Sequence, residues 1–414
     1  MDADVDVAIV GAGAAGIAAA RRLAAGRLSS MVLEATGRIG GRAWTCDVAG
    51  LALDLGCGWL HSADRNPWTR IAEAAGFTID CRAPAWGQQY RDLGFPQAEQ
   101  TAAKRAQGGW AERLATAPPA SDCAADALER DGEWNAYLHA MSGFISGAGL
   151  ERISVADLRA YETASTGCNW RARAGYGTVI TASLPRRVDL RLSTPVNSIE
   201  LIRRGVELVT PVGVVRARVA ILTVSTTVLA QGAIKLPPDL DAWRRAAARL
   251  PLGRNEKLFL EIVGESPFAP ETRVIGNPRD RRTGAYYLRP LDRPVVECFT
   301  GGDSAQMVEE KGPAAGFAYA IDQLAALFGS SVRRTLHPLV ASCWGRMTHV
   351  QGAYSYALPG QATARKDLAL PFDQRLFFAG EATHAYDFST AHGAYESGLR
   401  AADEAIEALA RGRA

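Results

Sequence analysis

The sequence has no excess of charge of one sign and no long apolar run. Its 46 basic and 44 acidic residues leave a net charge of +2 at pH 7. A nucleic-acid-binding protein would carry a basic patch, and a membrane span would need about 20 consecutive apolar residues. We therefore expect no nucleic-acid partner and no membrane partner. The first apolar run, Val5 to Val10, lacks the basic segment and cleavage site of a signal peptide, which favours a cytoplasmic protein.

Cysteine and histidine are also scarce. The seven cysteines are an odd number without a Cys-x-x-Cys pair, and the six histidines show no metal-ligand spacing. These counts argue against a disulfide framework and against a metal site.

The first fifty residues contain the pattern of a dinucleotide-binding βαβ unit. The run from Val5 to Val10 precedes glycines at the spacing Gly-x-Gly-x-x-Gly, an alanine-rich helical segment follows, and a second apolar run ends in Glu34. Gly11 permits the tight turn, Gly13 lets the backbone approach a pyrophosphate, and Gly16 lets the helix pack against the strand. The pattern alone does not separate NAD from FAD.

Glu34 and the loop after it make the prediction more specific. Glu34 would accept hydrogen bonds from ribose hydroxyls and would repel a 2′-phosphate, which disfavours NADP. Shortly after it, Gly40 and Gly41 stand between Arg38 and Arg42. Such a loop can fold over a pyrophosphate, whose charge the two arginines would balance as bidentate donors.

The βαβ unit and this double-glycine loop together resemble the flavin-containing amine oxidase family, closest to its polyamine oxidase and flavin-dependent histone demethylase branch. The resemblance implies an α/β fold with a Rossmann-like FAD-binding domain of the GR2 type and an α+β substrate-binding domain, both built from discontinuous segments. We expect residues 1–80, 167–250 and 345–414 in the first domain, and 81–166 and 251–344 in the second. The alanine-rich stretch at about 85–165 predicts a helical insertion, which no motif covers.

Sequence patterns between the motifs predict further elements. Asn66 and Pro67 are a typical helix start before a helix over 68–75. A β-rich section follows Gly175, with strands predicted over 188–192, 196–202, 206–209 and 214–224 and a hairpin turn at 210–213. A helix over 313–328 and a strand over 335–344 are predicted nearer the C-terminus.

A strand is also predicted over 254–262, where Lys257, Phe259 and Glu261 would share one face. A lysine on a strand face is usually solvated, but the chain has 5 lysines against 41 arginines. Because lysine can lose its proton and arginine cannot, position 257 is one where such an amine could be required. The segment also resembles the family's strand whose lysine holds a water against flavin N5, which implies that role for Lys257.

The C-terminal region carries a second set of motifs. An apolar strand that begins at Leu376 is predicted to end at Gly380 and Glu381, where the carboxylate could reach a ribityl or ribose hydroxyl. An amphipathic helix is predicted to begin near Thr390, and its N-terminal dipole would stabilise the anionic N1–C2=O locus of reduced flavin. The Gly-Glu pair followed by Thr-x-His-Gly-Ala resembles the polyamine oxidase and histone demethylase pattern.

The resemblance also implies the substrate site. Trp59 and His61 belong to a segment that passes the flavin ring in polyamine oxidases, so Trp59 would shape the pocket and His61 would contact a distal ammonium or nothing. Tyr354 matches one wall of an aromatic cage, although an ordinary core tyrosine fits the sequence as well. Thr390 matches the opposite wall, where monoamine oxidases have an aromatic residue, and this leaves room for a bulkier or secondary amine.

Two departures from family patterns limit the chemistry. Ala353 stands where monoamine oxidases have the cysteine that bonds the flavin, so we expect noncovalent FAD. Trp59 stands, by register, where L-amino-acid oxidases have the arginine that binds the substrate carboxylate, which disfavours amino acids as substrates.

The resemblance extends the set of FAD contacts. Val196 would lie near the adenine, although a valine in a strand core fits the sequence equally well. The full set of residues expected to bind FAD is Gly11, Gly13, Ala14, Ala15, Gly16, Glu34, Ala35, Arg38, Gly40, Gly41, Arg42, Gly56, Gly58, Trp59, Val196, Trp344, Gly380, Glu381, Thr390, Ala391 and Ala394.

The predicted activity is FAD-dependent amine oxidation. Hydride would pass from the α-carbon of a polyamine or another secondary amine to flavin N5, the imine would hydrolyse to an aldehyde, and oxygen would reoxidise the flavin to give hydrogen peroxide. Three alternatives stay open: a related flavin desaturase or dehydrogenase of a biosynthetic pathway, a flavoprotein scaffold in which FAD is structural, and a biosynthetic oxidase for one complex natural amine. Either a monomer or a homodimer is compatible with the sequence.

Overall fold

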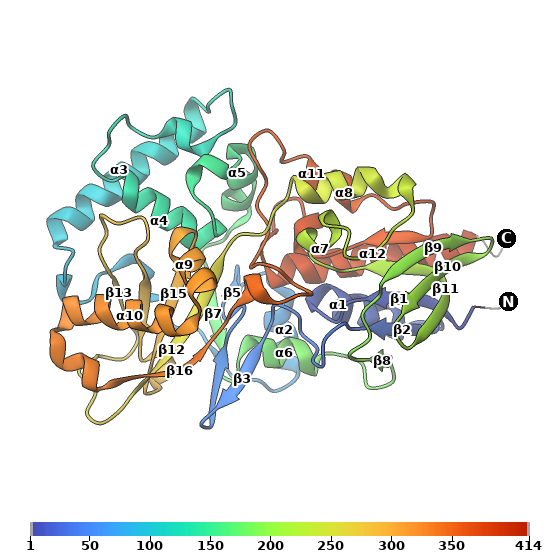
Figure 1. Ribbon diagram of the computed structural model, residues 1–414, viewed down its shortest axis with the longest axis horizontal. Helices are drawn as coiled ribbons and strands as arrows, with labels where there is room; N and C mark the ends of the chain where they lie inside the picture. The colour runs from blue at the N-terminus through green and yellow to red at the C-terminus, as the bar shows by residue number, and fades with distance from the viewer. Residues whose placement is uncertain (1–2, 412–414) are drawn as a thin grey trace.

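The computed structural model describes residues 3–411, in which a seven-stranded and a five-stranded β-sheet lie toward opposite ends of the long axis (Figure 1). Both ends of the described part, residues 3–411, lie beside the larger sheet, and the helices α3, α4 and α5 lie on the side of the smaller one (Figure 1). Within residues 3–411 no helix is long and apolar enough to cross a membrane.

The larger sheet contains the predicted βαβ unit. Its strand order is β8-β2-β1-β11-β10-β9, and β17 pairs with β11. The parallel strands are β1 (Val5–Val10), β2 (Ser30–Leu33), β8 (Asp189–Arg191), β11 (Gly213–Leu222) and β17 (Leu376–Phe378). The antiparallel strands are β9 (Ser198–Ile202) and β10 (Gly205–Thr210). The predicted hairpin is confirmed, since Thr210 pairs with Gly213.

Small residues let two helices cover one face of this sheet closely. They are α1 (Ala14–Ala24) and α12 (Ala391–Arg411), which lie side by side in Figure 1. A Cβ atom at Gly398 would come within 2.2 Å of the Ala15 carbonyl oxygen, so only glycine allows this approach. The opposite face packs against α7 (Thr226–Ala230), α8 (Asp241–Ala248) and α11 (Ala364–Ala369).

The smaller sheet is antiparallel, with the strand order β13-β14-β15-β12-β16. Its strands are β12 (Asn255–Ile262), β13 (Thr272–Ile275), β14 (Ala285–Leu288), β15 (Val295–Gly301) and β16 (Leu336–Ala341). The helices α9 (Asp303–Lys311) and α10 (Pro313–Phe328) follow β15, and the prediction of a helix over 313–328 is confirmed. Leu258, Leu260 and Ile262 pack in the core with α10, as the alternation along β12 predicts.

The strand predicted over 335–344 ends three residues early. Trp344 lies in a 3-10 turn, because its backbone N–H donates to Glu256 Oε1 at 2.6 Å instead of to a neighbouring strand. The sequence did not show this capture of a backbone group by a buried carboxylate.

Three helices occupy the region in which an insertion was predicted. They are α3 (Gln97–Thr116), α4 (Asn135–Ser146) and α5 (Val155–Ala164). The remaining elements are β3 (Thr45–Val48), β4 (Leu51–Asp54), β5 (Leu60–His61), α2 (Pro67–Ala74), β6 (Ile79–Asp80), β7 (Asn169–Ala172) and α6 (Tyr176–Ala182). The start of α2 is as predicted, since the Asn66 side chain accepts from the Trp68 N–H. The boundaries between the two domains stay a prediction.

Candidate active site

A cavity of about 850 Å³ extends from the larger sheet to the smaller one. At one end it is lined by residues that follow the carboxyl ends of β1, β2 and β11, namely Gly11, Glu34 and Thr223. Ligands of open α/β sheets bind at this edge. At the other end it is lined by Lys257 of β12 and Phe299 of β15, from one face of the smaller sheet.

The glycine turn and the double-glycine loop meet at the first end. Gly13 and Gly40 form an isolated parallel bridge, and a Cβ at Gly41 would lie 3.2 Å from the Gly13 Cα. Gly13 is the N-cap of α1, and within residues 3–411 no side chain caps this helix start, so the N–H groups of its first turn are suited to bind an anion.

Gly16 does not line the cavity. A Cβ there would come within 1.9 Å of the Gly11 carbonyl oxygen, so the glycine serves the close packing of helix against strand. This is the role that its place in the motif predicts.

Glu34 is buried at the end of β2 and lines the cavity. Its carboxylate accepts hydrogen bonds from the Ala12 N–H at 2.8 Å, the Thr36 N–H at 2.9 Å and the Thr36 hydroxyl at 2.7 Å. These donors fix the carboxylate where the motif predicts a ribose.

The two arginines of the loop differ in their partners. Arg42 donates to the Ala353 carbonyl at 2.6 Å and to Glu381 Oε1 at 2.8 Å. Arg38 lies over the Trp44 ring with its guanidinium carbon 4.3 Å from the ring centroid, and it forms no ion pair within residues 3–411. Burial lowers the pKa of Arg38. Of the pair, Arg38 is therefore the one whose charge is not already balanced.

Glu381 is held by several donors at once. Besides Arg42, it accepts from the Ser355 N–H and hydroxyl and from the Ser389 N–H. Burial alone would raise the pKa of Glu381, but Arg42 and Arg365 outweigh it and hold the pKa below its usual range. The carboxylate is thus ionised and joins the double-glycine loop to the start of α12.

Lys257 is buried in the cavity beside two carboxylates. Its Nζ lies 3.0 Å from Glu297 Oε1, and Asp54 adds a second negative charge nearby. Burial would lower the pKa of Lys257, but Glu297 and Asp54 raise it above the usual value. These carboxylates favour the ammonium form and so argue against the reason suggested from the sequence, that position 257 requires an amine able to lose its proton. The side chain stays an ammonium.

Aromatic side chains form a wall at the substrate end. The Trp59 ring makes edge contacts with Trp86 and Tyr287, with centroids 4.7 and 5.9 Å apart. His61 lies 5.9 Å from Trp86, and its Nδ1 is 2.6 Å from Asn169 Oδ1. Burial lowers the pKa of His61 to about 4, so the ring is neutral near pH 7.

Tyr354 and Thr390 both line the cavity, and both are fixed by the backbone. The Tyr354 hydroxyl donates to the Phe144 carbonyl at 2.7 Å, and burial raises its pKa strongly. The Thr390 hydroxyl donates to the Asp387 carbonyl and accepts from the Gly393 N–H, which makes Thr390 the cap of α12. The predicted helix start near Thr390 is confirmed.

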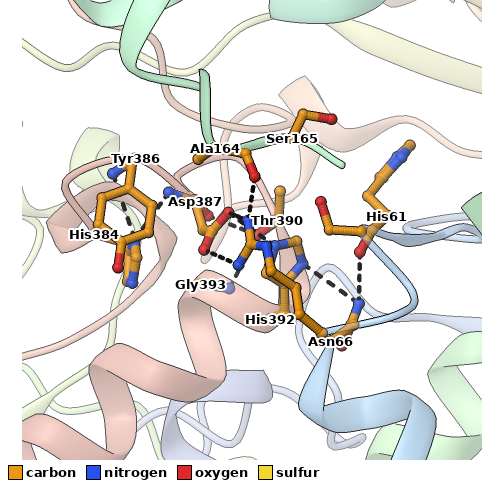
Figure 2. Close-up of polar contacts among 12 residues, drawn as sticks. His61, Asn66, Ala164, Ser165, His384, Tyr386, Asp387, Thr390, His392 and Gly393 are labelled. Carbon is orange, nitrogen blue, oxygen red and sulfur yellow. Dashed lines mark hydrogen bonds and ion pairs between the residues drawn. The ribbon is translucent and has the colours of Figure 1, made fainter. Parts of the chain in front are cut away.

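A polar network surrounds this helix start (Figure 2). Asp387 accepts from both terminal nitrogens of Arg65, at 2.5 and 2.7 Å, and lies 3.1 Å from His392 Nε2. Ligand atoms of His384, Asp387 and Glu396 come within 4.8 Å of one another, as a metal site would require. Because Arg65 occupies both Asp387 oxygens, a cation there would have to displace a guanidinium.

The other residues assigned to FAD are placed along the same cavity. They are Ala35, Gly56, Gly58, Val196, Trp344, Gly380, Ala391 and Ala394. Their contacts with a cofactor stay predictions.

Sequence reasoning missed three residues that line the substrate end, Trp86, Arg273 and Glu297, and it missed Asp54, which lies beside Lys257. Asp54 directly precedes the segment of Trp59 and His61, so its position was a usable indication. Glu297 and Arg273 carry no local motif, and only the pairing of β13, β14, β15 and β12 brings them to the cavity.

Comparison with known proteins settles the family. The family described as "Flavin containing amine oxidoreductase" matches residues 88–406. The chain belongs to this family. A "NAD(P)-binding Rossmann-like domain" matches residues 9–75, in agreement with the βαβ unit. As a member, the protein is a flavin-dependent amine oxidoreductase.

Relatives lie in the branch that the motifs predict. Polyamine oxidase 2 of Arabidopsis thaliana is 28% identical over 438 residues, covering 96% of this chain and 87% of that protein. Lysine-specific histone demethylase 1 homolog 2 of the same plant is 26% identical over 446 residues, covering 97% of this chain and 58% of the other. A putrescine oxidase double mutant from a redesign of cofactor binding has a TM-score of 0.75 at 20% identity and covers 97% of this chain and 99% of its own. The predicted fold class is confirmed.

Proposed function

We propose that the protein oxidises a polyamine or another secondary amine with FAD that is bound noncovalently, and that oxygen reoxidises the flavin to give hydrogen peroxide. The observation that carries this proposal is the continuity of one cavity. It joins the dinucleotide end, at Gly11 and Glu34, to the ion pair of Lys257 and Glu297. The polyamine oxidases among the relatives support an amine as the substrate.

The residues at the dinucleotide end fit FAD. The N–H groups at the start of α1 suit a phosphate, and Gly13 and Gly41, which pack against each other, have no side chain that would keep a pyrophosphate from the backbone. Glu34 would hold a ribose and Arg38 would balance phosphate charge. When bound, the flavin supplies the hydride acceptor and passes electrons to oxygen.

The protein's own contribution is to bind, orient and desolvate the amine. Trp59 and Tyr354 would keep water from the reacting carbon. The Nδ1–H of neutral His61 donates to Asn169, which leaves Nε2 as an acceptor for a substrate N–H. The Lys257 ammonium, fixed by Glu297, would hold and orient a water molecule through its N–H donors.

Anaerobic mixing tests the proposal. Purified protein with bound FAD is mixed with spermine, spermidine, N-acetylated polyamines, putrescine and simple monoamines, while the absorption band of oxidised flavin is followed. Rapid loss of this band with one class, its return when oxygen is admitted, and the appearance of hydrogen peroxide are expected. FAD that no amine reduces would contradict the proposal and favour the desaturase or the scaffold.

The noncovalent state has its own test. Because Ala353 offers no thiol, acid precipitation should leave the flavin in the supernatant. Flavin that stays with the pellet would show a covalent bond to another residue.

A further inference from the structure

The charges of the cavity are unevenly balanced at the substrate end. Lys257 is paired with Glu297, and Asp157 is paired with Arg365 at 2.6 Å. Glu162 is exposed to solvent on α5. Arg273 on β13 lines the cavity as well, and no carboxylate within residues 3–411 forms an ion pair with it.

Arg273 also has few other partners. Its Nη1 donates to the Trp86 carbonyl at 2.8 Å, and the titratable groups near it are the phenols of Tyr137 and Tyr287. Burial lowers the pKa of Arg273 to about 10, which still leaves a cation at neutral pH. A guanidinium has five N–H donors in a planar fork that matches a carboxylate. A neutral side chain could hold the Trp86 carbonyl without the cost of desolvating a charge.

The sheet fixes how far this cation lies from Lys257. Arg273 pairs with Tyr287, Tyr287 pairs with Glu297, and the strand of Glu297 pairs with the strand of Lys257. Three strand spacings and an offset of two residues separate the Cα atoms of Arg273 and Lys257 by about 16 Å. Both side chains line the same cavity from the same face.

We propose that the amine substrate carries a carboxylate, which Arg273 binds at the end of the cavity away from Lys257. The inference rests on the proposed amine oxidation and names its substrate class. An α-amino acid does not meet this geometry, because its carboxylate is attached to the reacting carbon. An amine with several methylene groups between nitrogen and carboxylate does.

Matched substrates test the inference on the FAD-loaded enzyme. The three probes are 6-(N-methylamino)hexanoate, its amide and N-methyl-1,6-hexanediamine, which share their chain length and reacting group. We expect the second-order rate constant of flavin reduction to be at least tenfold larger for the carboxylate than for either of the others. In Arg273→Gln this preference should disappear, in Arg273→Lys part of it should remain, and in Arg333→Gln, a change on the exposed surface, it should persist.

The outcomes separate the two proposals. An amide or diamine that reduces the flavin as fast as the carboxylate overturns the role of Arg273 and leaves amine oxidation standing. If the wild-type enzyme shows no preference for the carboxylate and Arg273→Gln reduces the rate equally for all three probes, the arginine has a purely structural role. This outcome also overturns the role of Arg273 in binding the carboxylate. If no amine reduces the flavin, the proposed function fails.

Equilibrium binding gives a readout that needs no turnover. Calorimetry should detect hexanoate binding to the wild-type protein and at least tenfold weaker binding to Arg273→Gln. Equal binding to both overturns the inference. If Arg273→Gln does not fold, Arg273→Lys should bind hexanoate more weakly than the wild type but not lose binding, and the three probes on the wild-type enzyme still decide.

Discussion

Lys257 Nζ lies 3.0 Å from Glu297 Oε1, between adjacent strands β12 and β15 and inside the cavity. Asp54 brings a second carboxylate from β4, so the lysine is held as an ammonium by two segments distant in sequence. A charged lysine can donate hydrogen bonds and stabilise negative charge, but it cannot act as a base. Its role at the site is therefore that of a fixed hydrogen-bond donor.

Replacing this lysine should slow the chemistry. We expect Lys257→Met to lower the rate of flavin reduction or of reoxidation more than tenfold, because the donor at the floor of the cavity is lost. Stopped-flow absorbance of the flavin measures both steps. Lys366→Met, on the exposed side of α11, is the matched control and should leave the rates unchanged. Unchanged traces for Lys257→Met would remove the lysine from the mechanism.

The same substitution leaves the half-buried Glu297 without its cation, so a loss of stability could be mistaken for a loss of catalysis. The double variant Lys257→Met with Glu297→Gln removes both charges and should recover stability but not rate. Recovery of the rate together with stability would show that the single variant acts through folding alone.

The ion pair of Asp157 and Arg365 should matter more for folding than any surface pair. The two side chains are 5% and 1% exposed and join α5 to α11 through two hydrogen bonds. Asp157→Asn leaves the Arg365 charge buried, with an expected loss of roughly 3–5 kcal/mol. Urea denaturation measures it.

Asp322 and Arg333 supply the matched control for that pair. Both are exposed, at 63% and 48%, and their ion pair should contribute less than about 1 kcal/mol. A loss for Asp157→Asn as small as that for Asp322→Asn would mean that the buried pair relaxes around its missing partner.

The burial of Glu256 predicts that the stability of the protein depends on pH. It is fully buried, and burial raises its pKa to about 8, with a hydrogen bond to Glu309 beside it. Since the pKa is raised on folding, the protonated form is favoured in the folded state, and its stabilisation is lost as pH rises from about 4.5 to 8. Glu256→Gln has no such proton to lose. As pH rises over this range, the melting temperature of this variant should therefore increase relative to that of the wild type.

Thermal melts between pH 5 and 9 check this expectation. Glu407→Gln, which is exposed, should follow the wild type at every pH. A constant difference between Glu256→Gln and the wild type would show that the carboxyl does not titrate in this range.

The sequence predicted the parts of the site that depend on local geometry. The glycines of the β1–α1 turn and the start of α12 at Thr390 follow from backbone conformation and capping, which a short segment determines. The charge state of Lys257 depends instead on Glu297, which the pairing of β12 with β15 brings close, and on Asp54, which comes from the separate β3–β4 hairpin. For the same reason Arg273 could not be found, because nothing near it in sequence marks a site.

The end of β16 shows a second limit of sequence patterns. Mostly apolar residues continue to Trp344, but the buried Glu256 carboxylate accepts the hydrogen bond of the Trp344 backbone N–H, and the strand ends at Ala341. A pattern of side chains does not report a competition for backbone hydrogen bonds.

A substitution at Gly16 would test the close contact between α1 and the glycine turn at the dinucleotide end of the cavity. A Cβ there would meet the Gly11 carbonyl oxygen at 1.9 Å, and because that oxygen belongs to the backbone, the turn itself must shift. We expect Gly16→Ala to weaken FAD binding at least tenfold, measured by flavin fluorescence on titration, and to lower the melting temperature.

Gly108→Ala is the matched control, since Gly108 is exposed in the interior of α3 and nothing lies within 4 Å of its added carbon. That change should stabilise the protein by about 0.5–1 kcal/mol through helix propensity and leave FAD binding unchanged. If Gly16→Ala binds FAD as tightly as Gly108→Ala does, the turn is not the phosphate cradle.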